Sequence, residues 1–231
     1  MTVEAMEAVF SRMADEKRIS FDKAYAEQLY EEYMETGKLQ EAHRNEFVSR
    51  LRGKEILLVG PGKSSLLGKD LVRDFMDKPD AVCISVNFEY LHCRTDYIFL
   101  SNLRRAKNMG EKQLQKCIVT SNIPSADVYM RVSYKELLNN VETVYDNAGL
   151  MAIKLLVISG VRKVTLIGFD GYSHDVADNF AYESMILVNP RAVLDSFNRG
   201  MQTVLRQYRE KIEIRFLMKP KHLQVEEPEK E

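Results

Sequence analysis

Five short apolar segments of this chain end abruptly in small polar residues, and this pattern limits the fold more than any other feature. Parallel strands that are buried on both faces of a sheet have such continuous apolar runs. Helical patterns separate the runs, and this alternation predicts an α/β fold with a doubly wound, mostly parallel sheet of the Rossmann-like type. The segments and the residues after them read EILLVG-PGKSS, AVCIS-VNF, DYIFL-SNLRR, KCIVT-SN and KVTLI-GFDGYSHD. We expect strands at 55–60, 81–86, 97–100, 117–120, 163–167 and 213–217, with a further candidate at 126–132.

Composition divides the chain into three parts. Residues 1–52 contain one glycine and no proline and are predicted to be a segment of linker or docking helices. In that segment Phe21, Tyr25, Leu29 and Tyr33 recur every four residues and form an aromatic stripe, which either packs on the main domain or docks on a partner. Residues 53–220 are the α/β domain, and 221–231 are a charged tail. Within the domain we expect one helix at 65–76 and a long apolar helix that Asp146 caps.

Bulk properties exclude several classes of protein. The net charge is −1, from 33 basic and 34 acidic residues, which gives no field that would attract nucleic acid or an acidic membrane. No apolar run approaches the ~20 residues of a membrane-spanning helix, and MTVEAMEAVF does not read as a signal peptide. The three cysteines have no CxxC spacing, which argues against a disulfide framework and a zinc site. These features predict a cytoplasmic protein and leave its oligomeric state open.

The polar strand ends predict a ligand site. In open α/β sheets, ligands bind just beyond the carboxyl ends of the strands. The turn at 60–65 reads GPGKSS, and its glycines, free N–H groups and helix start favour a phosphate. It is not a Walker A loop, because Leu57 stands where that motif requires glycine. A tight turn without a ligand is the alternative. The residues expected to bind a nucleotide or a phosphorylated small molecule are Gly60, Gly62, Lys63, Ser64, Ser65, Asn87, Ser101, Asn102, Ser121, Asn122, Asn147, Gly149 and Asp170.

Two residues of the GFDGYSHD segment are weak candidates for catalysis. Asp170 is suited to hold a ribose hydroxyl or a Mg²⁺ ion that bridges phosphates. His174 is a candidate general base, although a single histidine in a polar loop is more often only solvated. Gly149, in the first turn of the apolar helix, is explained by the close approach of either a ligand or a strand.

These residues resemble a known nucleotide-binding fold. The segments ILLVGPGKSS, ISVNFEY, DNAGLMAIKLLVISGVRKVTLIGFDGYS and YREKIEIRFL are similar to bacterial family-42 sialyltransferases and archaeal hydroxymethylpterin pyrophosphokinase-like proteins, over about residues 54–218. The resemblance implies a nucleotide of the CMP/CTP or ATP type. The transferases have a histidine base after the GFDGY-like loop, where this chain reads NFAYESMILVNPR. The cytidine-binding roles of those transferases fall here on Gly60, Gly62, Ser64, Asn87, Asn147 and Gly149.

A second resemblance covers the whole chain. EKRISFDKAYAEQLYEEY, together with TSNI and GFDGYS, resembles the C-terminal half of bacterial proteins similar to 4-hydroxy-2-oxovalerate aldolase and hydroxymethylglutaryl-CoA lyase. It implies that residues 1–50 connect to an aldolase barrel, which this chain lacks, so that aldol chemistry is excluded for the chain alone. The sequence thus predicts a nucleotide-binding domain, of transferase type or accessory to an aldolase-like enzyme. The alternative is a non-catalytic interaction domain that docks on such a barrel through its N-terminal helices.

Overall fold

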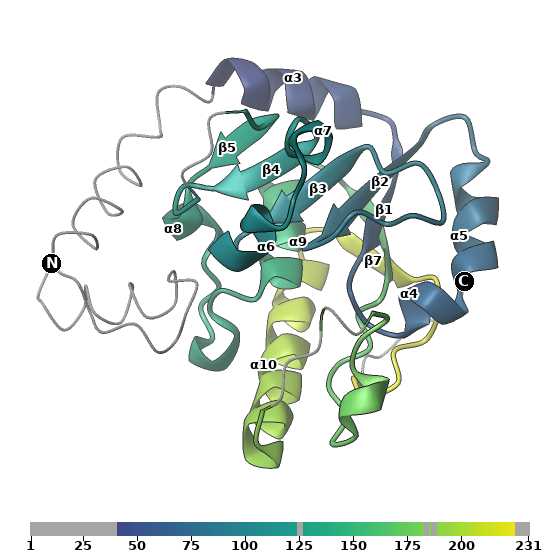
Figure 1. Ribbon diagram of the computed structural model, residues 1–231, viewed down its shortest axis with the longest axis vertical. Helices are drawn as coiled ribbons and strands as arrows, with labels where there is room; N and C mark the ends of the chain where they lie inside the picture. The colour runs from purple at the N-terminus through teal and green to yellow at the C-terminus, as the bar shows by residue number, and fades with distance from the viewer. Residues whose placement is uncertain (1–40, 124–126, 183–184, 186–188, 225–231) are drawn as a thin grey trace, which may run out of the picture.

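A seven-stranded parallel sheet, covered by helices on both faces, forms the centre of the molecule (Figure 1). The computed structural model describes residues 41–123, 127–182, 185 and 189–224. The strand order is β5-β4-β3-β2-β1-β6-β7, and each neighbouring pair is parallel. This confirms the predicted Rossmann-like α/β fold. The strands are β1 (Glu55–Val59), β2 (Ala81–Val86), β3 (Tyr97–Leu100), β4 (Cys117–Thr120), β5 (Met130–Val132), β6 (Lys163–Ile167) and β7 (Glu213–Phe216).

Alternate residues of the central strands face the two helical layers. In β1, Ile56 and Leu58 belong to the larger core, while Leu57 and Val59 belong to a second core on the other face. All four side chains are at most 1% exposed, which explains why the strand reads as one apolar run rather than as an alternating pattern. The helices are α3 (Glu41–Leu51), α4 (Ser64–Leu67), α5 (Lys69–Met76), α6 (Leu103–Lys107), α7 (Glu111–Leu114), α8 (Tyr134–Leu137), α9 (Ala148–Ile158) and α10 (Arg191–Arg209), with 3-10 turns η1 (Glu142–Val144) and η2 (Val176–Asp178).

Two helix predictions need correction. The helix expected at 65–76 is split into α4 and α5 at Gly68, where a Cβ atom would lie 2.5 Å from the Met218 sulfur. The long apolar helix α9 is capped by Asn147, whose side chain accepts a hydrogen bond from the Leu150 N–H at 3.1 Å. Asp146, the expected cap, instead accepts a hydrogen bond from the Tyr134 hydroxyl at 3.1 Å.

The ends of the described chain pack onto the sheet domain. Phe47 and Leu51 of α3 enter the larger core, and the Phe47 ring meets the Tyr97 ring edge-on with 5.2 Å between centroids. The predicted aromatic stripe at Phe21–Tyr33 lies outside the described residues. At the other end, Leu223 is 5% exposed, so the predicted tail at 221–231 begins with packed residues. Among the described residues, no helix has the length and apolar character needed to cross a membrane.

Candidate functional site

The loops that follow β1 and β6 lie against each other at the carboxyl edge of the sheet. Strand β1 pairs with β2 on one side and β6 on the other, and this is where the strand order reverses direction. The Gly60 N–H donates to the Ile167 carbonyl at 2.7 Å, and the Gly62 N–H donates to the Gly168 carbonyl at 2.9 Å. Ligands of open α/β sheets bind at such a reversal. We call the edge formed by the segments after β1, β2 and β6 the rim.

The glycines of the first loop are required by the neighbouring loop. A Cβ atom at Gly60 would lie 2.4 Å from the Gly168 carbonyl oxygen. At Gly62 it would lie 2.5 Å from Oδ2 of Asp170 and 2.6 Å from the same carbonyl oxygen. Contact with the loop after β6 therefore accounts for both glycines. The sequence pattern predicted the close approach of a phosphate at these positions, with a tight turn as the alternative, and in the structure the neighbouring loop makes the approach.

Asp170 occupies the start of α4, where the sequence predicted a phosphate. Its Oδ2 accepts a hydrogen bond from the Ser64 N–H at 2.8 Å, and the residue is 6% exposed. The Ser64 hydroxyl in turn accepts from the Gly168 N–H at 2.9 Å. The His222 N–H donates to the Asp170 carbonyl at 2.7 Å, which fixes the backbone of this residue. A carboxylate of the chain itself thus sits at the expected anion position.

The side chains of Lys63 and Ser65 have partners within the protein. Lys63 donates from Nζ to the Ala177 carbonyl at 2.8 Å and lies 3.7 Å from Asp178 Oδ1. The Ser65 hydroxyl donates to the Gly62 carbonyl at 2.8 Å, and the Ser65 carbonyl accepts from the Tyr90 hydroxyl at 2.7 Å. These contacts stabilise the 60–65 loop as a compact turn.

Asn87 differs from the other rim residues. It directly follows β2 and has a φ of 71°, the only positive value at a non-glycine residue in the described part of the chain. Its Oδ1 atom is buried and has no hydrogen-bond partner among the described residues. Left-handed non-glycine residues cluster at functional sites, and an unsatisfied buried polar atom calls for a partner such as a ligand or a water molecule.

A second unsatisfied polar atom lies in the segment that contacts the first rim loop. The hydroxyl of Tyr182 is buried without a hydrogen-bond partner in the described structure, and burial raises its pKa. The Tyr182 ring packs on Phe88, the residue after Asn87, with 5.6 Å between centroids. The Ala181 N–H donates to the Pro61 carbonyl at 2.9 Å, so this segment folds back over the first rim loop. Sequence reasoning missed Tyr182, because its place at the rim depends on the path of residues 171–182.

The polar residues after β3 and β4 lie along the same edge and have hydrogen-bond partners within the protein. Asn122 donates from Nδ2 to the Ser101 carbonyl at 3.1 Å, and its Oδ1 accepts from the Thr120 hydroxyl at 2.5 Å. The Ser121 hydroxyl accepts from the Tyr134 N–H at 3.1 Å. The Asn102 carbonyl accepts from the N–H groups of Arg105 and Ala106 in α6. The sequence therefore located this edge correctly, and the structure gives these residues roles in joining strands and capping helices.

Asn147, Gly149 and His174 also have structural contacts. Asn147 caps α9, and a Cβ atom at Gly149 would lie 2.7 Å from the Phe169 ring, so the loop after β6 explains this glycine. His174 Nε2 lies 2.7 Å from Asp195 Oδ1 at the start of α10. Both of those side chains are nearly half exposed, at 44% and 46%. They form an ion pair on the surface when the histidine is protonated.

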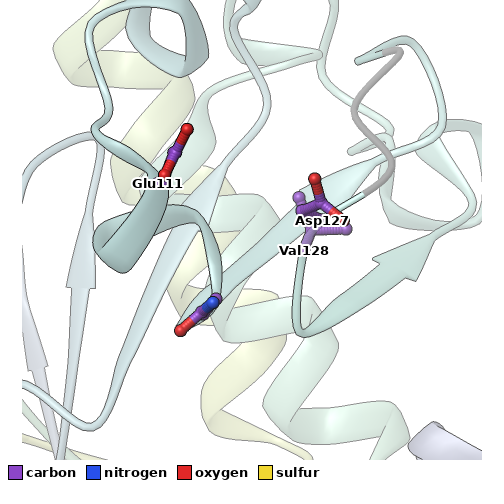
Figure 2. Close-up of a pocket in the computed structure, with 4 residues that line it drawn as sticks. Glu111, Asp127 and Val128 are labelled. Atoms are coloured by element: carbon purple, nitrogen blue, oxygen red, sulfur yellow. The ribbon is translucent and has the colours of Figure 1, made fainter.

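A shallow pocket lies at the amino ends of the strands, on the opposite side of the sheet from the rim. Glu111 and Gln115 precede β4, and Asp127 and Val128 precede β5, so these lining residues surround the amino ends of two strands. Figure 2 shows the Glu111 and Asp127 side chains on two sides of this pocket. Among the described residues, no cluster of three His, Cys, Asp or Glu side chains is arranged to hold a metal ion. The pocket and the rim are therefore separate places on the molecule.

Comparison with known proteins yields no family for this chain. No family model matches it, and no curated protein matches it. The geometry of the rim is therefore the basis for assigning a function.

Proposed function

We propose that this chain binds a nucleotide, or a similar phosphorylated small molecule, at the rim. The observation that carries the proposal is that two of the buried, unpartnered polar atoms of the described residues, on Asn87 and Tyr182, belong to segments at the rim. Leaving a buried polar group unsatisfied costs about 1–3 kcal/mol, so folded proteins retain few such groups. A ligand that bonds to both atoms recovers this free energy on binding.

The chemistry of the two atoms favours a nucleobase edge. Asn87 Oδ1 accepts a hydrogen bond, and a tyrosine hydroxyl both donates and accepts. A base such as cytosine or adenine carries an amino donor beside a ring-nitrogen acceptor, which suits these two partners. A phosphate offers only acceptors and leaves Asn87 Oδ1 unpaired. The base is therefore assigned to the Asn87 and Tyr182 side of the rim.

Asp170 determines how the rest of the ligand lies. Because its carboxylate already accepts from the Ser64 N–H, a bare phosphate at that position would meet a negative charge. Neighbouring strands are spaced about 4.8 Å apart, so β2 and β6 lie roughly 10 Å apart on the two sides of β1, and Asn87 and Asp170 follow their carboxyl ends. At that distance Asp170 is suited to accept from a sugar hydroxyl. Mg²⁺ commonly binds one or two carboxylates together with substrate phosphates, so a magnesium nucleotide also fits.

Two roles of the bound nucleotide are consistent with binding at the rim. In one, the nucleotide is the donor substrate of a transferase reaction. In the other, it is the ligand of a domain that is accessory to an aldolase-like enzyme. The alternative of docking through residues 20–50 gains no support from the described part of that segment, because α3 directs Phe47 and Leu51 into the chain's own core.

Thermal unfolding with CMP, CTP, ATP and GTP, each with and without Mg²⁺, tests the proposal. A ligand at ~100 times its Kd stabilises the folded state by about 2.7 kcal/mol. Asn87→Gly and Tyr182→Phe remove the two proposed partners and should abolish the shift in melting temperature. The matched controls are Asn108→Gly, after α6, and Tyr129→Phe, before β5, and both should retain it. No shift with any ligand, or equal loss in the controls, contradicts the proposal.

A further inference from the structure

Two cysteine thiols lie side by side on neighbouring segments. The Sγ atoms of Cys83 and Cys93 are 3.8 Å apart. Cys83 lies within β2 and is fully buried, while Cys93 lies in the segment between β2 and β3 and is partly exposed. Both thiols are free. The pair is distinct from the proposed ligand atoms, and its chemistry does not depend on the proposed function.

Local hydrogen bonds hold the two cysteines together. The carboxylate of Asp96 accepts from the Cys83 N–H at 2.9 Å, which ties the end of the segment to β2. Arg94 donates to the Ala81 carbonyl at 3.0 Å, and the Thr95 hydroxyl donates to the Tyr90 carbonyl at 2.9 Å. A disulfide needs an S–S distance of about 2.05 Å, so the sulfur atoms must approach by a little under 2 Å. Because Cys93 is on a connecting segment, its side chain can make most of this movement.

The surroundings make Cys93 the more reactive thiol. When Cys93 loses its proton, the Cys83 S–H donates to the resulting thiolate, which lowers the pKa of Cys93. The same hydrogen bond, followed by burial, raises the pKa of Cys83. Cys117 offers a contrast within the chain, since burial raises its pKa to about 12 and its thiol donates to the Gln113 carbonyl at 3.2 Å. Thiolate character and exposure together determine susceptibility to oxidation.

We propose that Cys83 and Cys93 form an oxidisable pair that peroxide converts to a disulfide in the folded protein. The Cys93 thiolate attacks one peroxide oxygen, the O–O bond breaks, and the departing hydroxide takes a proton and leaves as water. Cys93 is thereby oxidised by two electrons to a sulfenic acid. The Cys83 sulfur then attacks Cys93 Sγ, the S–S bond forms, the S–O bond breaks, and a second water leaves with the Cys83 proton. Two thiols and one hydrogen peroxide thus yield one disulfide and two waters.

Tyr90 connects the segment that carries Cys93 to the rim by hydrogen bonds. This residue is 1% exposed, lies between the two cysteines in sequence, and donates a hydrogen bond from its hydroxyl to the Ser65 carbonyl. Its carbonyl accepts from Thr95, two residues after Cys93. Oxidation therefore takes place in a segment that contacts the first rim loop.

To test this, the full, folded chain is treated with hydrogen peroxide in modest excess. The remaining thiols are then counted with a chromogenic disulfide reagent under denaturing conditions. Wild type should lose two of its three thiols, and peptide mapping should recover one disulfide joining the peptides of Cys83 and Cys93. Reduction with dithiothreitol should restore all three thiols. Circular dichroism before and after treatment confirms that the chain stays folded.

Three variants make the test decisive. Cys93→Ser changes a partly exposed side chain and should lower the rate of thiol loss by at least about tenfold. Cys83→Ala should leave Cys93 as a sulfenic acid that dimedone traps, and Cys117→Ser should oxidise as wild type does. Thiol loss in Cys93→Ser at the wild-type rate overturns the proposal. A disulfide that includes Cys117, or three intact thiols after treatment of wild type, also overturns it.

Discussion

The carboxylate of Asp170 accepts a hydrogen bond from the backbone N–H of Ser64, with 2.8 Å between Oδ2 and the nitrogen. This contact joins the loop after β6 to the first turn of α4, at the place where the strand order reverses. It means that the chain itself supplies a negative group to the free N–H of a helix start, a position that usually favours anions. Any ligand at the rim must accommodate this carboxylate.

Replacing Asp170 should separate the role of its hydrogen bond from that of its charge. Asp170→Ala leaves the Ser64 N–H without a partner in a buried setting and should lower the free energy of unfolding by about 1–3 kcal/mol. Asp170→Asn keeps an acceptor at the same place and should lower it by less. Urea denaturation of both variants measures the difference. Equal losses would mean that the hydrogen bond contributes little.

Gly62 should tolerate no side chain. In Gly62→Ala the new Cβ atom would meet Oδ2 of Asp170 at 2.5 Å, so the two loops must move apart. Such overpacking typically lowers the free energy of unfolding by about 1–3 kcal/mol. Gly110→Ala is the matched control, because the nearest heavy atom to its Cβ is 3.7 Å away at the end of a Gln113 side chain. A Gly62→Ala protein as stable as Gly110→Ala would contradict the packing described for the two loops.

Two small replacements of Asn87 should differ in stability. At a φ of 71° an alanine is strained, whereas glycine adopts this conformation freely. Asn87→Ala should therefore be less stable than Asn87→Gly by about 1 kcal/mol. Chemical denaturation of the two variants side by side gives this difference without reference to any ligand. If alanine is the more stable of the two, the left-handed conformation is not present in solution.

Glu89 should make stability depend on pH in the acid range. Its carboxylate accepts hydrogen bonds from Gln113 Nε2 at 2.9 Å and Lys116 Nζ at 3.0 Å, and these lower its pKa below the ordinary value of 4.5. A carboxylate with a lower pKa in the folded state stabilises the fold above its unfolded pKa. That contribution is lost as the pH falls through the folded pKa.

Two variants test this dependence. In Glu89→Gln the melting temperature should fall less steeply than in wild type as the pH drops below about 4.5, because the amide does not titrate in this range. Lys116→Met removes one of the two donors and should reduce the slope only partly. Melting temperatures between neutral pH and pH 3 measure both. A Glu89→Gln curve parallel to that of wild type would show that this carboxylate makes no such contribution.

The sequence predicted the architecture well because burial on both faces of a parallel sheet leaves a clear signal. The apolar run before Gly60 became β1, and the one before Gly168 became β6. Since the carboxyl ends of parallel strands share one edge, the polar residues that follow them could also be placed on that edge. The split between α4 and α5 occurs at Gly68, and the side chain that leaves no room for a Cβ atom there belongs to Met218, 150 positions away, so local sequence did not reveal this contact.

The roles of individual site residues were less predictable. A glycine signals a close approach, but the sequence does not say whether a ligand or another loop approaches, and at Gly62 it is Asp170. The Asn122 side chain donates to the Ser101 carbonyl at the end of the neighbouring strand, a contact that no local pattern encodes, and accepts from the hydroxyl of Thr120 two residues before it. Asn87 was predicted from its place after a strand, the hydrogen-bonding capacity of its amide and the resemblance to the transferases. Its left-handed backbone and unpaired oxygen, which now distinguish it, are properties of the fold.

The most direct test of the proposed site is a backbone-amide NMR titration of the full chain with CMP and, separately, with ATP in the presence of Mg²⁺. We expect saturable shifts that are concentrated at residues 60–65, Asn87, Asp170 and Tyr182 and are lost in Asn87→Gly. Saturable shifts confined to the other edge, around Glu111 and Asp127, or no saturable shifts with either nucleotide, would contradict the proposed site.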